Sequence, residues 1–185
     1  MQKMAKFERV SYAQFRADWL DTWFDDERDY INSMTGDVDV AIESHIQQVY
    51  DSIKLPKRAT MQSAGYDFYM PVGMTIEAGE SKKIPTGICC EMYDGWVLKL
   101  YPRSGHGFKY GVHMANTVGV IDGDYIESDN EGHIFIKLVN DSALAKDIRF
   151  EAEDAFAQGI FTPFGITLDD EVTEQRNGGF GSTGR

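Results

Sequence analysis

Short apolar runs, broken by Gly, Pro and Asp, dominate the chain after Thr60 and limit its fold more than any other feature. Runs of this length are typical of strands, and their close spacing favours an antiparallel arrangement over alternating βα units. We therefore expect a mainly β fold, an antiparallel sandwich or jelly roll. The expected strands include Ile84–Cys90, Trp96–Tyr101, Ile134–Val139 and Ile160–Ile166.

Length and charge narrow the class of protein. A chain of 185 residues can bury one sizeable core, but not two. No apolar run approaches the roughly 20 residues of a membrane span, and the N-terminus lacks the apolar stretch of a signal peptide, so we expect a cytoplasmic protein. The net charge of −12 disfavours general nucleic-acid binding, which needs a basic face.

Residues 1–53 differ in pattern from the rest and are expected to form a helical extension. Ser11 and Gln14 match a capping box at the start of a helix. Large apolar side chains then recur on one side of two helical periods. They are Phe15, Trp19 and Trp23 in the first period, with Tyr12 and Leu20 nearby, and Ile42, Ile46, Val49 and Ile53 in the second. Such a stripe packs onto the protein's own core or docks a partner, and the sequence leaves both open.

Cys89 and Cys90 are the only cysteines and lie next to each other in an expected strand. Neighbours in a strand point to opposite faces, which argues against a disulfide between them, and two ligands alone make no zinc site. We expect them to be small core or interface residues.

A stretch from Asn116 to Tyr125 places three useful groups close together in sequence. An apolar strand leads to a turn at Gly123, and strand character resumes at Ile134, so we expect the tip of a β-hairpin. The Asn116 amide can hydrogen-bond a base, Asp122 can take a proton, and the Tyr125 ring can wall off a sugar.

Two other stretches contain groups that can bind phosphate. Arg103, Ser104 and Gly105 follow a strand and offer a guanidinium fork, a hydroxyl and backbone amides. The glycine-rich tail, residues 176–185, cannot pack itself and is expected to be mobile until something orders it. Its polar and aromatic groups can contact phosphate and stack on a base. They are Arg176, Phe180, Gly181, Ser182 and Thr183.

Jointly these elements describe a site for a nucleoside triphosphate. Each is a modest signal alone, and Asp67 within Ala64–Phe68 could equally belong to an ordinary turn. Neither a Walker loop nor a Rossmann fingerprint occurs in the sequence.

In chain order these stretches resemble the five motifs of the trimeric dUTPases, the deoxyuridine triphosphate nucleotidohydrolases. The matching segments are Ala64–Phe68, Pro102–Gly105, Asn116–Tyr125, Phe156–Phe161 and Arg176–Gly184. The resemblance covers about residues 54–184. The N-terminal extension, Lys54–Thr60 and Ser128–Ile134 are similar to a subgroup common in Gram-positive bacteria and their phages.

The resemblance implies a dUTPase-like jelly roll, a distorted β-barrel, over residues 54–175. Residues 1–53 are then an N-terminal α-helical extension, and 176–185 a mobile lid. It also implies a homotrimer whose active sites each take residues from all three chains, in the cytoplasm of a bacterial or phage-infected bacterial cell. The implied reaction is Mg²⁺-assisted hydrolysis of dUTP to dUMP and pyrophosphate. That reaction limits uracil in DNA and supplies dUMP for dTMP synthesis.

The resemblance also implies catalytic roles. By position, Asp122 matches the family's general base, and Gln158 matches the glutamine that helps hold the attacking water. Asp67 matches a carboxylate near the water shell of the metal. The family holds Mg²⁺ mainly through the triphosphate and water, so no direct protein ligand is expected.

The implied substrate contacts fall into two groups. Asn116, with backbone groups near Val120 and Ile121, matches the uracil reader, and Tyr125 matches the ring under the deoxyribose. The implied phosphate contacts are Arg103, Ser104 and Gly105 from another chain, with Arg176, Gly181, Ser182 and Thr183 from the tail. Phe180 matches the ring that closes over the uracil.

Two other functions stay open at this point. A deaminase of the related dCTP fold is disfavoured because Tyr125, the segment around it and the tail match the hydrolases. A regulatory protein that docks a partner on residues 1–53 or 126–132 can coexist with catalysis. The extension occupies the place of the family's usual first strand, and residues 126–132 are longer than usual there.

Overall fold

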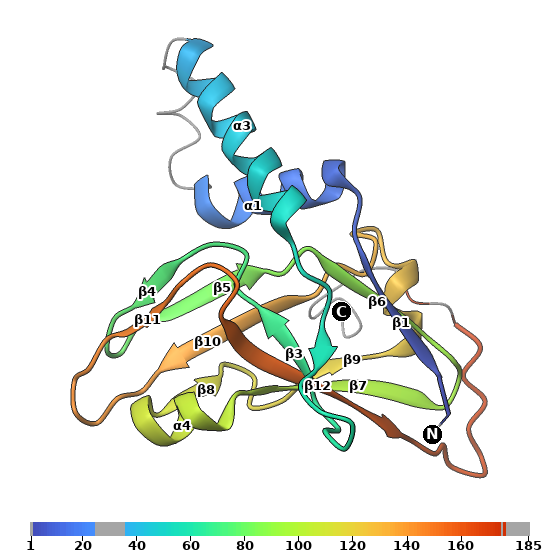
Figure 1. Cartoon of the computed structure of the whole chain (residues 1–185). Helices are drawn as coiled ribbons and strands as arrows, with labels where there is room; N and C mark the ends of the chain where they lie inside the picture. Colours follow the sequence, from blue (N-terminus) through green and yellow to red (C-terminus); the bar gives the residue numbers. More distant parts are fainter. Residues whose placement is uncertain (1, 25–35, 175, 177–185) are drawn as a thin grey trace.

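A computed structural model describes residues 2–24, 36–174 and 176, and it shows a mainly β protein with a pair of helices on one side (Figure 1). Every strand pair in this described part is antiparallel, which confirms the predicted arrangement. No helix among the described residues is long and apolar enough to cross a bilayer.

The strands form four hydrogen-bonded groups in the described part. The largest has the order β2 (Lys57–Arg58), β3 (Tyr66–Tyr69), β12 (Ala155–Pro163), β7 (Trp96–Pro102) and β9 (Gly119–Ile121). A second has the order β5 (Ser81–Pro85), β10 (Phe135–Asn140) and β8 (Val112–Met114). The pairs are β1 (Ala5–Arg9) with β6 (Ile88–Met92), and β4 (Met74–Ile76) with β11 (Ile148–Phe150). Together they enclose the main core, which includes Phe68, Leu98, Ile136 and Phe156.

The expected strands occur, with changes at their ends. The run Ile84–Cys90 splits into β5 and β6 because Gly87 has a φ of 72°, which a continuous strand does not allow. The last strand starts earlier than the predicted Ile160–Ile166 and ends at Pro163.

The predicted hairpin around Gly123 is wrong. Strand β9 pairs with β7, whereas β10 pairs with β5 and β8. After Asp122 the chain forms a short 3-10 helix, η1 (Gly123–Glu127), and the Tyr125 N–H donates to the Asp122 carbonyl at 3.1 Å. The alternating pattern reports which face of a strand is buried, and it carries no information on the partner strand.

The predicted N-terminal helices are present as α1 (Tyr12–Phe24) and α3 (Gly36–Ser52). Helix α1 begins as expected, because the Gln14 N–H donates to Ser11 Oγ at 3.2 Å. The second half of the capping box is replaced, since the Ser11 N–H donates to Glu131 Oε2 at 2.7 Å instead. The start of α1 is thus joined to a loop far along the chain.

The aromatic stripe packs on the protein's own core. Phe15 and Trp19 are buried in a second apolar cluster together with Ile46, Val49 and Cys89. Cys90 lies in the main core instead. The two free cysteines therefore point to opposite faces of β6, as their spacing predicts.

Residues 1–53 also supply a strand that the sequence pattern did not predict. Strand β1 pairs with β6, so the first strand expected in the family is not displaced by the helices. The helical pair follows β1 in the chain, and the start and end of this helical segment lie close together. The Val10 N–H donates to the Gly87 carbonyl at 3.1 Å, and the Tyr50 hydroxyl donates to the Val10 carbonyl at 2.8 Å.

Candidate active site

Asp67, Arg103 and Gln158 form one cluster, although they come from three separate motifs. Strand β12 lies between β3 and β7, and this order places Gln158 opposite Asp67 on one side and opposite Tyr101 on the other. Arg103 follows the end of β7, and its Nη1 lies 2.8 Å from Asp67 Oδ2. The sheet therefore brings a carboxylate, a guanidinium and an amide together.

Gly65 makes room for this cluster and was missing from the predicted site. A Cβ at Gly65 would lie 2.6 Å from Gln158 Oε1, so a larger residue would displace that amide. On its other side, Gln158 Nε2 donates to the Pro102 carbonyl at 3.4 Å. The signal in the sequence was the glycine directly before Tyr66 and Asp67.

The phosphate-binding turn predicted at Arg103–Gly105 is the start of a helix, α4 (Ser104–Tyr110). The Arg103 carbonyl accepts the N–H groups of His106 at 3.0 Å and Gly107 at 3.2 Å. The N–H groups of Ser104 and Gly105 lie before the first bonded N–H of the helix. Like the first donors of any helix, they have no acceptor within it. They suit an anion placed beside Arg103.

Asp122 belongs to a second cluster, at the end of β9. Arg176 contacts the Asp122 carboxylate, and its Nε lies 3.1 Å from Asp124 Oδ1. The Arg176 guanidinium also lies 5.6 Å from the centre of the Tyr125 ring. Asp124 was not among the predicted site residues. Its position two residues after Asp122, in Asp122-Gly-Asp, could have indicated it.

Tyr125 is largely buried, with 4% of its surface exposed. Its hydroxyl donates to the His133 carbonyl at 2.9 Å, and Asn130 Nδ2 donates to that hydroxyl at 2.9 Å. Burial raises the pKa of Tyr125 above its ordinary value, which keeps the hydroxyl protonated and able to donate. The ring is thus held in a fixed position below Arg176.

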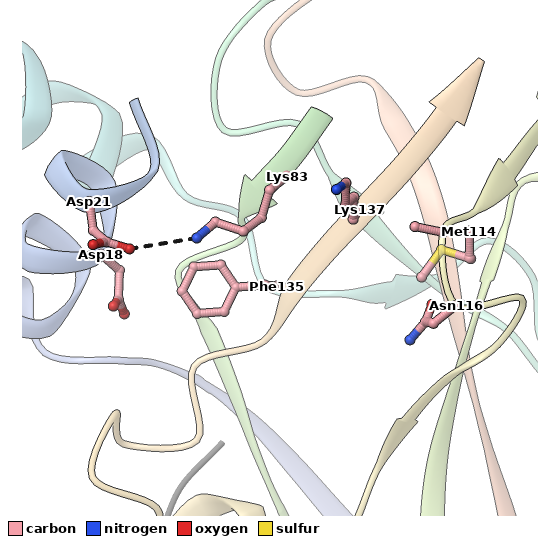
Figure 2. Close-up of a pocket in the computed structure, with 8 residues that line it drawn as sticks. Asp18, Asp21, Lys83, Met114, Asn116, Phe135 and Lys137 are labelled. Atoms are coloured by element: carbon pink, nitrogen blue, oxygen red, sulfur yellow. Dashed lines mark ion pairs between the residues drawn. The ribbon is translucent and has the colours of Figure 1, made fainter. Parts of the chain in front are cut away.

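Asn116 lies apart from Asp122 and lines a different cavity. Asn116 and Phe135 line one of about 520 Å³ between helix α1 and the β5–β10 sheet, shown in Figure 2. Asp122 and Arg176 line another of about 550 Å³. The predicted uracil reader, Asn116, and the predicted general base, Asp122, therefore line two different cavities of the described part.

The other expected hairpin contacts differ in exposure. Val120 is exposed, whereas the Ile121 side chain is buried in the main core. Only the backbone of Ile121 could therefore contact a ligand. The tail residues Phe180, Gly181, Ser182 and Thr183 lie outside the described residues.

The two clusters lie at opposite ends of strand β7. Ile121 is opposite Leu98, so Asp122 lies beside the start of β7, whereas Arg103 directly follows its end. Arg103 lies six positions after Val97, which at roughly 3.3 Å per residue corresponds to about 20 Å. No single small group could contact both.

The cavity beside Asp122 is acidic. Its charged lining residues are Glu91, Asp94, Asp122, Asp124, Glu127 and Arg176. With five carboxylates against one guanidinium, it would repel a triphosphate unless further positive charge is brought to it.

The described residues hold no group of three or more His, Cys, Asp or Glu side chains suited to a metal ion. Asp67, whose side chain is 16% exposed, is a carboxylate within the Arg103 cluster. Because a carboxylate has two oxygens, it can bond Arg103 and a metal-bound water at the same time. This donor set fits a Mg²⁺ ion held mainly by phosphates and water.

Comparison with known proteins gives one consistent family. A family model described as dUTPase matches residues 51–184. A deoxyuridine 5'-triphosphate nucleotidohydrolase of Lactococcus lactis is 43% identical over 135 residues, covering 71% of this chain and 89% of the relative. One of Chromobacterium violaceum is 38% identical over 139 residues, covering 71% and 88%.

Solved structures agree on the fold. The crystal structure of dUTPase from Streptococcus mutans is 41% identical, with a TM-score of 0.55, and the match covers 61% of this chain and 88% of that one. A dUTPase from phage phi11 of S. aureus is 22% identical with a TM-score of 0.53, a likeness of fold alone, over 65% of this chain and 90% of that one. The matched family segment begins at the last two residues of helix α3.

Proposed function

The chain belongs to the dUTPase family, and from that premise we propose that it hydrolyses dUTP with a water activated by Asp122. It is a dUTP diphosphatase, a hydrolase of nucleotide metabolism that forms dUMP and pyrophosphate. The observation that carries the proposal is the family match over residues 51–184, which contains every motif of the predicted site. In the cell this reaction would limit uracil in DNA and supply dUMP for dTMP synthesis.

In the proposed mechanism Asp122 accepts a proton from a water held by the Gln158 amide of a neighbouring chain, because Gln158 belongs to the Arg103 cluster. The water oxygen bonds to the α-phosphorus as the bond to the bridging oxygen breaks, and pyrophosphate leaves. A partly exposed carboxylate suits this role because a water molecule can reach it. Arg176, which contacts Asp122 in the free chain, would move to the γ-phosphate.

The active site is proposed to be shared between chains of a homotrimer. The separation of about 20 Å along β7 supports this, because one chain cannot bring Asp122 and Arg103 to the same phosphate group. The acidic cavity beside Asp122 supports it too. Arg103, with the amides of Ser104 and Gly105, would come from a neighbouring chain and supply the missing positive charge.

Mg²⁺ is proposed as the cofactor, held by the triphosphate and water. When bound it would neutralise charge on the phosphate oxygens. Asp67 would accept hydrogen bonds from the waters of the ion while it keeps Arg103 in place.

The remaining proposed contacts select the substrate. Asn116 and the backbone of Val120 and Ile121 would read the uracil, and Tyr125 would exclude a ribose 2′-hydroxyl. A wrong base leaves buried hydrogen-bonding groups unpaired, which explains strong discrimination. The tail would close the site, with Phe180 on the base and Gly181, Ser182 and Thr183 on the phosphates.

No observation favours a second function. The aromatic stripe that could dock a regulatory partner is buried in the second apolar cluster. Residues 126–132, the other expected docking segment, are held to the start of α1 through Glu131. The family match favours the hydrolase over the related deaminase.

The test is pyrophosphate release from dUTP, dTTP, dCTP and UTP, each with Mg²⁺ and with EDTA. We expect release from dUTP alone, and only with Mg²⁺. Equal release from UTP would contradict the sugar-reading role of Tyr125. No release from dUTP under either condition would overturn the proposed function.

A further inference from the structure

We infer that Asp18 of helix α1 is a positioning residue for Tyr125, the ring proposed to face the deoxyribose, and that it acts through His133. The inference rests on the proposed function, because it assigns a role in substrate selection. Asp18 lies outside the matched segment 51–184, so nothing in the family match accounts for it.

Asp18 fixes the ring of His133. The His133 side chain is fully buried, and its Nδ1 lies 2.5 Å from Asp18 Oδ2. On the other side of the ring, the Gly87 N–H donates to Nε2 at 2.8 Å. Because a backbone N–H can only donate, Nε2 must accept, so the ring proton sits on Nδ1 and is donated to Asp18. One tautomer and one ring orientation result.

Asp18 is itself held on its helix. Gln14 Nε2, one turn earlier in α1, donates to the same Oδ2 at 2.8 Å. Figure 2 shows Asp18 and Asp21 on α1, with Asp21 turned toward Lys83 and joined to it by an ion pair. The two carboxylates on one helix therefore have different partners, and only Asp18 contacts His133.

The backbone of His133 holds Tyr125. The His133 carbonyl accepts the Tyr125 hydroxyl at 2.9 Å. Asn130 Nδ2 donates to the same hydroxyl at 2.9 Å and to the His133 carbonyl at 3.4 Å. The position of the Tyr125 ring thus depends on the loop between η1 and β10.

Helix α1 also holds this loop at a second point. The Ser11 N–H and hydroxyl donate to the two carboxylate oxygens of Glu131, each at 2.7 Å. Glu131 has a φ of 55°, a conformation that is uncommon for residues other than glycine and that persists only where contacts hold it. Both anchors of the loop, Ser11 and Asp18, belong to the inserted helix and its cap.

A shift of the Tyr125 ring would change the space left for the sugar. Small displacements of a group that contacts substrate have large effects on rate, and a ring that excludes a hydroxyl works only while it is held. Loss of the Asp18 contact frees the His133 ring and loosens the carbonyl that accepts the Tyr125 hydroxyl. The consequence is weaker discrimination against UTP.

The experiment measures kcat/KM for dUTP and for UTP in Asp18→Ala, Asp18→Asn and Asp21→Ala. In Asp18→Ala we expect the ratio of the two values to fall about tenfold, the size of one lost hydrogen bond. Asp18→Asn keeps an oxygen that accepts from His133 Nδ1 and should retain the ratio. Asp21→Ala removes the same charge from the same helix and should leave the ratio unchanged.

A second readout does not depend on turnover. In the imidazole region of a ¹H–¹⁵N NMR spectrum, the wild type and Asp21→Ala should show His133 with its proton on Nδ1 and slow exchange. Asp18→Ala should lose that signal. If Asp18→Ala does not fold, Glu131→Gln weakens the other anchor at the surface and should lower the dUTP to UTP ratio in the same direction.

Two outcomes would overturn the inference: an unchanged ratio in Asp18→Ala, including an equal fall for both substrates, and a His133 signal that persists without Asp18. An equal fall would mark Asp18 as merely structural. If the wild type releases no pyrophosphate from dUTP, the proposed function fails, and the NMR result still decides whether Asp18 fixes His133.

Discussion

The guanidinium of Arg176 contacts the carboxylate of Asp122, so the proposed base is neutralised by the first residue of the proposed lid. Asp124 shares the same guanidinium at 3.1 Å. In the free chain Arg176 therefore occupies the place next to Asp122. A triphosphate that attracts Arg176 would release the carboxylate for catalysis.

Replacing Asp122 by Asn should remove the base and leave the substrate contacts. We expect kcat to fall by about 10² to 10⁴, the usual contribution of general base catalysis, with dUTP still bound. Pyrophosphate release and calorimetric titration measure the two quantities. Asp124→Asn is the matched control, since it loosens the same Arg176 contact, and it should keep most of the rate. A near-wild-type kcat in Asp122→Asn would remove Asp122 as base.

Deleting residues 176–185 should abolish turnover and leave the fold intact. The buried hydrophobic residues of the described part end at Ala157, so the tail contributes little to the core. Steady-state kinetics and the urea midpoint should separate the two effects. Deletion of 177–185 alone, which keeps Arg176, shows whether the charge suffices without Phe180. Full activity after either deletion would contradict the lid.

Gly87→Ala should destabilise the protein more than Gly79→Ala. Both glycines have positive φ, 72° and 82°, so each substitution carries backbone strain of about 1–3 kcal/mol. Only at Gly87 would the new Cβ meet other residues, with Ile53 Cδ1 at 2.3 Å and the Phe15 ring at 3.3 Å. Urea unfolding of both variants measures the difference.

The double variant Gly87→Ala with Ile53→Ala tests the cause of that difference. It should be less destabilised than the sum of the two single variants, because the clash is gone. Additive effects would mean that Ile53 does not press on Gly87.

Both cysteines should resist alkylation in the folded protein. Burial raises the pKa of Cys89 to about 11 and that of Cys90 to about 12. A raised pKa lowers the thiolate fraction, so at pH 8 about one Cys89 thiol in a thousand is ionised, and fewer for Cys90. Iodoacetamide labelling should therefore be at least about 100-fold slower than in guanidinium and should speed up as the pH rises. Rapid labelling of the folded protein at pH 8 would contradict this burial.

The candidate site residues could be named from the sequence, whereas their arrangement could not. Asp122, Tyr125, Arg103 and Arg176 could be named as candidates because their residue types and order are specific. The pairing of β9 with β7 could not be found, since alternation fixes the buried face of a strand and leaves its neighbour open. The separation of Asp122 from Arg103 follows from that pairing, so it too required the structure.

Other features depended on contacts between distant parts of the chain. Strand β1 was missed because Phe7 is its only large apolar residue and its partner β6 lies far along the sequence. The Asp18–His133 contact is likewise invisible in sequence. A lone His in a β segment and an Asp on a helix do not predict a contact with each other. Only the packing of the helix on the sheet brings them together.

Both ends of the helical pair lie at Gly87, and this affects how the segment between them can be changed. Val10 bonds to the Gly87 carbonyl, and the Ile53 side chain lies over the same residue, so the segment between them begins and ends at one spot on the barrel. A stretch of this kind can be gained, excised or exchanged as a cassette without altering strand order, and a short turn can take its place. Removal of the helical pair would keep the strand order but would cost the loop between η1 and β10 its contacts with Ser11 and Asp18.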